Sequence, residues 1–175
     1  MKSILKKAVA YSVFSSLAIV PLVLVATPAS AQPAGLQGSY LGAGLSVGVT
    51  NDSHGDSNDL GGNVQGRFDI PQAPVSVRGA ALFNGDSTAL MPIVTYDLPV
   101  SDRANLYAGA GYSFVTSDTA ASPLGDRDAV VLTAGAEGEV ARNVVLYGDA
   151  KLGLDAYRDS SDAAVSLQLG AAYRF

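Results

Sequence analysis

The feature that most constrains this chain is an alternation of apolar and polar residues that recurs in blocks of about ten residues. Clusters of Asp, Ser, Asn, Gly or Pro separate the blocks, as turns separate antiparallel strands. After the first 31 residues, no stretch is long and apolar enough for a membrane-spanning helix. The pattern therefore predicts an all-β protein.

The blocks number eight, which predicts eight antiparallel strands. They cover residues 39–50, 62–70, 75–83, 89–98, 105–116, 129–140, 144–157 and 163–175. The fourth is the least regular, because Met91 and Ile93 place apolar side chains on its polar face. Membrane-crossing strands need about 9 to 11 residues, whereas soluble strands most often have about 5 or 6. Length therefore favours an up-and-down transmembrane β-barrel over a soluble β-sandwich or lipocalin-like barrel, although the alternation alone fits all three.

The charged residues of these blocks share the face opposite the apolar residues. We expect them to form an ionic network in the barrel lumen, made of Arg67, Asp69, Arg78, Asp97, Glu137, Glu139, Asp149, Lys151, Asp155 and Arg174. A basic side chain facing lipid at mid-bilayer costs about 2–4 kcal/mol, whereas inside the barrel it can pair with a carboxylate. Because side chains fill an eight-stranded barrel, we interpret this network as structural, with a narrow, gated ion path as the alternative.

The first 31 residues have the pattern of a cleavable signal peptide. Lys2, Lys6 and Lys7 precede a mostly apolar run from Ala8 to Ala26, and small residues follow it. Ala29 and Ala31 occupy the two positions that a signal peptidase restricts to small side chains, so cleavage is expected after Ala31. A membrane anchor is the alternative reading, but serines and a proline interrupt the run. We therefore expect a signal peptide at residues 1–31 and one barrel domain at residues 32–175.

Composition excludes several other classes of protein. Removal of three lysines with the leader changes the formal net charge from −5 to −8, and an acidic chain is a poor nucleic-acid binder. The sequence has no Cys, which rules out disulfides and thiolate metal sites, and it has a single His. We expect no cofactor and no structural metal.

Two predicted loops contain residue types found in catalytic or calcium-binding sites. His54 follows Asp52 and Ser53, but sequence adjacency in a Gly-rich loop does not fix a catalytic geometry, so we expect no enzymatic activity. Acidic residues at Asp52, Asp56 and Asp59, and at Asp126 and Asp128, have the oxygen ligands that Ca²⁺ prefers. Their spacing matches no EF-hand, which favours solvated acidic loops over a calcium site.

Three segments carry a family resemblance. Tyr40–Gly44 opens the first strand, Tyr107–Tyr112 repeats its pattern in the fifth, and Tyr173–Phe175 closes the last. With these motifs the chain resembles the small eight-stranded outer-membrane barrels: the OmpA-type membrane domain, the OmpX type and the opacity-protein group. In such proteins the last strand resembles the signal read by the barrel-assembly machinery. The corresponding residues here are Leu167, Leu169, Ala171, Tyr173 and Phe175.

The resemblance and the even number of strands imply that both chain ends lie on the periplasmic side of a bacterial-type outer membrane. We expect a monomeric, non-enzymatic barrel with an envelope-structural or surface-interaction role. Its expected partners are outer-membrane lipid, the barrel-assembly machinery and periplasmic chaperones during biogenesis, and an extracellular ligand at the outer loops. The alternatives are a narrow gated ion channel of the minor-porin kind and a soluble periplasmic β-barrel that binds a small ligand.

Overall fold

The computed structural model describes residues 34–50, 60–84, 87–116, 122–157 and 163–175. Eight strands account for most of them. Their bounds are β1 Tyr40–Gly48, β2 Leu60–Asp69, β3 Val75–Phe83, β4 Thr88–Ser101, β5 Ala104–Val115, β6 Ala129–Ala141, β7 Val144–Leu154 and β8 Ala164–Arg174. No helix in these ranges is long and apolar enough to cross a membrane.

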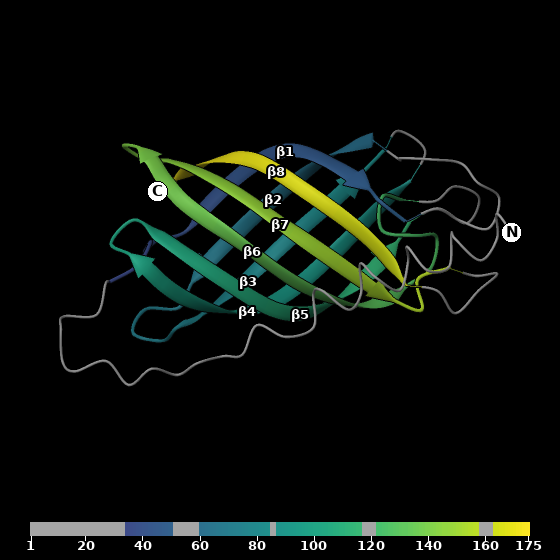
Figure 1. Cartoon of the computed structure of the whole chain (residues 1–175), viewed down its shortest axis with the longest axis horizontal. Helices are drawn as coiled ribbons and strands as arrows, with labels where there is room; N and C mark the ends of the chain where they lie inside the picture. The colour runs from purple at the N-terminus through teal and green to yellow at the C-terminus, as the bar shows by residue number, and fades with distance from the viewer. Residues whose placement is uncertain (1–33, 51–59, 85–86, 117–121, 158–162) are drawn as a thin grey trace, which may run out of the picture. The chain divides into compact units, whose positions relative to one another are not determined.

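The eight strands form a closed antiparallel barrel in which each strand pairs with its sequence neighbours. β1 pairs with β8 along the closing seam, where Leu45 lies opposite Leu169. Figure 1 shows these two strands side by side, with all strands tilted around the barrel. Closure pairs the backbone of every strand on both sides, so the barrel has no free sheet edge.

The predicted fold is confirmed, including the number of strands and their antiparallel order. The third block matches β3 at both ends, and the other bounds differ by at most three residues, as in the fourth and seventh blocks, where β4 continues to Ser101 and β7 stops at Leu154. The predicted signal peptide at residues 1–31, with Ala29 and Ala31, lies outside the described residues.

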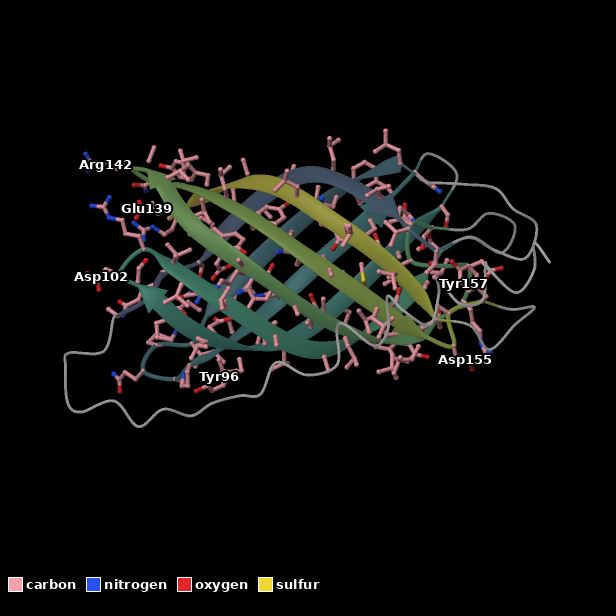
Figure 2. The ribbon with its side chains drawn as sticks, in the orientation of Figure 1. Tyr96, Asp102, Glu139, Arg142, Asp155 and Tyr157 are labelled. Carbon is pink, nitrogen blue, oxygen red and sulfur yellow. The ribbon has the colours of Figure 1, made fainter. Side chains whose placement is uncertain are left out.

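The outer face of the barrel carries the large apolar side chains. Residues such as Leu45, Val94 and Leu169 are about half or more exposed, and all eight strands contribute to this surface. Aromatic residues near the strand ends, such as Phe68, Phe83 and Tyr173, also point outward, and Figure 2 shows Tyr96 on the outside. An apolar exterior around a polar interior is the reverse of a soluble barrel.

The lumen is filled by side chains, and glycines provide the space for its largest ones. A Cβ on Gly170 would lie 2.4 Å from the Tyr147 hydroxyl oxygen, and one on Gly135 would lie 2.7 Å from a ring carbon of Tyr107. Only glycine at these two positions allows Tyr107 and Tyr147 to cross the narrow lumen.

The strand connections define two ends of the barrel, which we name by what they carry. The terminal end holds Ala34, Phe175 and the short turns after β2, β4 and β6. The opposite end holds the connections after β1, β3, β5 and β7. Figure 2 shows Asp102, Glu139 and Arg142 at the terminal end, and Asp155 and Tyr157 at the opposite end.

Candidate functional site

Four charged side chains form the centre of the lumen, and we call them the ionic quartet: Arg67, Arg78, Asp97 and Glu137. Arg67 lies 2.9 Å from Asp97 and 3.2 Å from Glu137, measured between nitrogen and oxygen. Arg78 lies 3.0 Å from Asp97 and 2.8 Å from Glu137. Each arginine therefore contacts both carboxylates, and the quartet joins β2, β3, β4 and β6. All four residues are at most 5% exposed.

Tyrosines extend this network across the barrel. The Tyr40 hydroxyl donates to Glu137 at 2.8 Å, and the Tyr107 hydroxyl donates to Asp149 at 2.8 Å. The Arg78 guanidinium carbon lies 3.7 Å from the centre of the Tyr107 ring, a cation–π contact that places the charge over the ring face. Sequence reasoning missed these tyrosines as lumen residues. The alternation along the strands could have found them. Tyr40, Tyr107 and Tyr147 each stand next to an outward-facing residue, so their own side chains point into the lumen.

A second ion pair lies further along the lumen on β7. The Lys151 ammonium contacts the Asp149 carboxylate and also donates to the side-chain oxygens of Gln65 at 3.3 Å and Gln168 at 3.2 Å. Lys151 is only 1% exposed, so these three acceptors replace water around a buried charge. Within the described lumen, three buried basic residues thus face three buried acidic ones.

The remaining predicted network residues lie at the terminal end or outside the lumen. Asp69 pairs with Arg67 at 3.0 Å, and Arg174 pairs with Glu139 at 2.9 Å, with these carboxylates and Arg174 partly exposed. The prediction for Asp155 is wrong. It follows the end of β7, its side chain is 53% exposed, and it pairs with exposed Arg127 at 3.1 Å at the opposite end of the barrel. The prediction assumed that the alternation of apolar and polar residues continues in a strand up to Asp155, but β7 ends before it.

An apolar cluster lies in the half of the lumen toward the opposite end, beside buried hydroxyls such as Ser113 and Ser166, and the sequence did not predict it. Buried side chains from β3, β4, β6 and β8 pack together there: Ala80, Leu82, Ala89, Met91, Ile93, Ala129, Val131 and Ala164. Met91 and Ile93 belong to this cluster, which explains why the fourth block looked irregular. They face inward like the charges, but into an apolar layer.

A turn at Ser122–Gly125 covers this apolar cluster at the opposite end of the barrel. Its Leu124 is 1% exposed and packs in the same cluster as Ala156 and Tyr157, which follow β7. Two backbone hydrogen bonds between Ser122 and Gly125 hold the turn, at 2.8 and 3.0 Å. Leu124 therefore fills the lumen from the opposite end of the barrel, at which β1, β5 and β7 end.

The terminal end is filled by the segment that precedes β1. We call residues Ala34–Ser39 the N-terminal strap. Its Leu36 is 2% exposed and packs with Tyr40, Val145, Tyr147 and Ala172. Beside the strap is a pocket of about 850 Å³, and its wall includes Arg67, Asn105 and Arg174.

The five residues of the predicted assembly signal all point outward, and Phe175 is 72% exposed. They are Leu167, Leu169, Ala171, Tyr173 and Phe175. Asp128 accepts a hydrogen bond from the Val115 amide at 2.8 Å. Among the described residues no three His, Cys, Asp or Glu side chains are grouped to hold a metal ion. His54 and its neighbours Asp52, Asp56 and Asp59 lie outside the described residues.

The profile of the outer membrane protein beta-barrel domain matches residues 18–175. The chain belongs to the outer-membrane β-barrel protein family. The apolar surface described above is accordingly the lipid-facing surface of an outer-membrane barrel, and the soluble alternative is not supported. Comparison with curated proteins gave no match.

Solved structures of small bacterial barrels share this fold. OprG from Pseudomonas aeruginosa superposes with a TM-score of 0.56 at 9% identity, covering 81% of this barrel protein's chain and 97% of its own. Neisserial surface protein A gives 0.55 at 16% identity over 81% and 99% of the two chains. Ail, the attachment invasion locus protein of Yersinia pestis, gives 0.51 at 18% identity over 80% and 100%. At these identities the likeness establishes the fold alone.

Proposed function

We propose that this outer-membrane barrel is a closed, non-enzymatic envelope protein that presents its connections at the opposite end of the barrel to the cell exterior. The observation that carries this proposal is the packed lumen. Leu124 with its apolar cluster fills one half, and the ionic quartet with Leu36 fills the other. A barrel packed in this way provides a rigid scaffold rather than a passage.

The terminal end is proposed to face the periplasm. An even strand number puts both chain ends on the same side, and short turns are typical of the periplasmic side of such barrels. The turns after β4 and β6 each leave only two residues between strands. The longer connections would then lie outside. Two barrels of the same fold, Neisserial surface protein A and the attachment invasion locus protein Ail, are named after a cell surface and after attachment. An extracellular ligand at these connections is therefore part of the proposal.

Ion conduction tests the closed state directly. Purified protein reconstituted in a planar phospholipid bilayer should give no unitary currents, because the packed side chains of the lumen leave no continuous water-filled path for an ion. A general porin added to the same bilayer serves as the positive control. Steady unitary currents from the purified protein would contradict the proposal and favour the narrow-channel alternative.

The last strand is proposed to direct assembly by the barrel-assembly machinery, after delivery by periplasmic chaperones. Its alternate residues form a continuous apolar row on the outside that ends at Phe175. Replacing Phe175 with Ala should lower the amount of heat-modifiable, membrane-assembled protein in cells severalfold, as measured by gel mobility of outer-membrane fractions.

Phe68 provides a matched control for this prediction, because it is an outward aromatic residue with nearly the same exposure, 69% against 72%, but lies on β2. Phe68→Ala should leave assembly in cells close to normal. Equal losses from both variants would show that Phe175 acts only as an interfacial anchor and that the proposed signal is wrong.

A further inference from the structure

The N-terminal strap enters the terminal end of the lumen as an extended peptide would enter a binding site. Ala34 and Gln37 are exposed, whereas Gly35 and Leu36 between them are buried. The Leu36 side chain occupies an apolar pocket formed by Tyr40, Val145, Tyr147 and Ala172. The Leu36 side chain is thus enclosed, while Gln37, the next residue, remains in solvent.

The backbone of Leu36 is bound by side chains from strands that are distant in sequence. Its N–H donates to Asn105 Oδ1 at 3.0 Å, and its C=O accepts from Asn105 Nδ2 at 2.9 Å. Arg67 Nη1 donates to the same carbonyl at 2.9 Å. The Asn105 side-chain amide thus binds both backbone groups of Leu36, as a neighbouring strand would. In peptide recognition, such main-chain hydrogen bonds provide affinity and a side-chain pocket provides specificity.

The residue before Leu36 is restricted to glycine by two observations. Gly35 has a φ of +73°, a backbone conformation that other residues rarely adopt. A Cβ at this position would lie 2.4 Å from Asn105 Oδ1 and 2.9 Å from Pro99 Cβ. The terminal end therefore selects a glycine followed by a branched aliphatic residue.

The strap is also linked to the ionic quartet. Asn105 donates to Glu137 at 3.1 Å with the same nitrogen that binds Leu36, and Arg67 contacts both the strap and Asp97. A strap that leaves the lumen would take acceptors away from Arg67 and Asn105. The pocket of about 850 Å³ beside the strap gives it space to move.

We propose that the terminal end of the lumen is a peptide-binding site whose occupant is this chain's own N-terminal strap. The Gly35-Leu36 pair is the recognised element, and Asn105 is the residue that holds it. The strap is a releasable plug, bound by a few side chains rather than by a strand ladder. This property is independent of the proposed surface role, since a barrel with or without ligands at its other end would carry it.

Thiol labelling tests this proposal, because the chain has no cysteine of its own. Leu36→Cys and Gln37→Cys are prepared separately in the full mature chain, refolded in phospholipid vesicles and checked by heat-modifiable mobility. A charged maleimide should label Cys at position 36 at least about tenfold more slowly than at position 37. Adding Asn105→Ala to Leu36→Cys should accelerate its labelling about tenfold, the effect of losing two hydrogen bonds.

Gln168→Ala is the matched control. Gln168 is another buried lumen amide with two hydrogen bonds, from Lys151 and to Ser166, and neither partner belongs to the strap or to the Leu36 pocket. It should change labelling at position 36 by less than about twofold. Three results would overturn the proposal: equal labelling at positions 36 and 37, no effect of Asn105→Ala, or the same acceleration from Gln168→Ala.

Hydrogen exchange keeps the test decisive if Leu36→Cys does not fold. In the unmodified chain the Leu36 amide should exchange much more slowly than the Gln37 amide, because Asn105 accepts its proton. Asn105→Ala alone should abolish that difference while leaving the amides of β6 protected. Fast exchange at Leu36 in the unmodified, folded protein would refute the plug.

Discussion

Replacing Arg78 with Met should destabilise the folded barrel by about 3–5 kcal/mol, the effect of breaking a buried ion pair from one side. Arg78 is 2% exposed and contacts Asp97 and Glu137 together. Without it, Arg67 is the one cation left to pair with both carboxylates among the described residues, and the Tyr107 ring loses the cation above it. Denaturant unfolding in phospholipid vesicles, followed by the fraction of heat-modifiable protein, measures the change.

Arg127→Met is the control for that loss, because Arg127 also pairs with a carboxylate but its side chain is 50% exposed. An exposed pair contributes about 0–1 kcal/mol. Combining Arg78→Met with Glu137→Gln should recover part of the stability, since the double variant removes one charge of each sign. If Arg78→Met is no more destabilising than Arg127→Met, the quartet does not stabilise the barrel.

Replacing Val64 with Arg should destabilise the membrane-inserted barrel by about 2–4 kcal/mol, because a charge would then face lipid at mid-bilayer. Val64 lies near the middle of β2 and points outward, 40% exposed. Its cross-strand neighbours are Ala43 and Ala81, so the longer side chain meets little steric resistance. The same vesicle unfolding assay reports the loss.

Leu60→Arg separates lipid exposure from a general effect of added charge. Leu60 is the first residue of β2 and 68% exposed, at the opposite end of the barrel, where a charge costs about 0–1 kcal/mol. Both variants replace a branched aliphatic residue with Arg and add one positive charge, but at different depths in the membrane. Equal effects of Val64→Arg and Leu60→Arg would mean that the middle of β2 does not face hydrocarbon.

The fold could be predicted because a barrel strand repeats a single local rule. Alternation assigned Arg67, Arg78 and Lys151 to the inside and Leu169 to the outside, and the structure places them there. The rule states which face a residue occupies, but not how far along the lumen it lies. That depth depends on register between strands, which is why the apolar layer around Met91 was not predicted.

The segments that fill the two ends of the lumen follow no periodic pattern at all. Leu36 and Leu124 are single apolar residues among Gly, Pro and polar neighbours, and nothing local distinguishes them from ordinary loop residues. Their burial depends on contacts with residues such as Asn105, 69 positions away from Leu36. The prediction for Asp155 failed for a related reason. The alternation of apolar and polar residues continues past the end of β7, although the strand itself has ended before Asp155.

The charged network and the apolar cluster in the lumen respond differently to substitution. In the apolar cluster, shortening Leu82 or Met91 removes volume without leaving a charge unpaired, so a cavity made among these apolar side chains would stay dry and accept an apolar guest. In the charged network, removing one charge leaves its partner unpaired unless a second residue is changed with it. An engineer could therefore hollow the barrel from its loop end into a small receptor, with the ionic quartet kept as its floor.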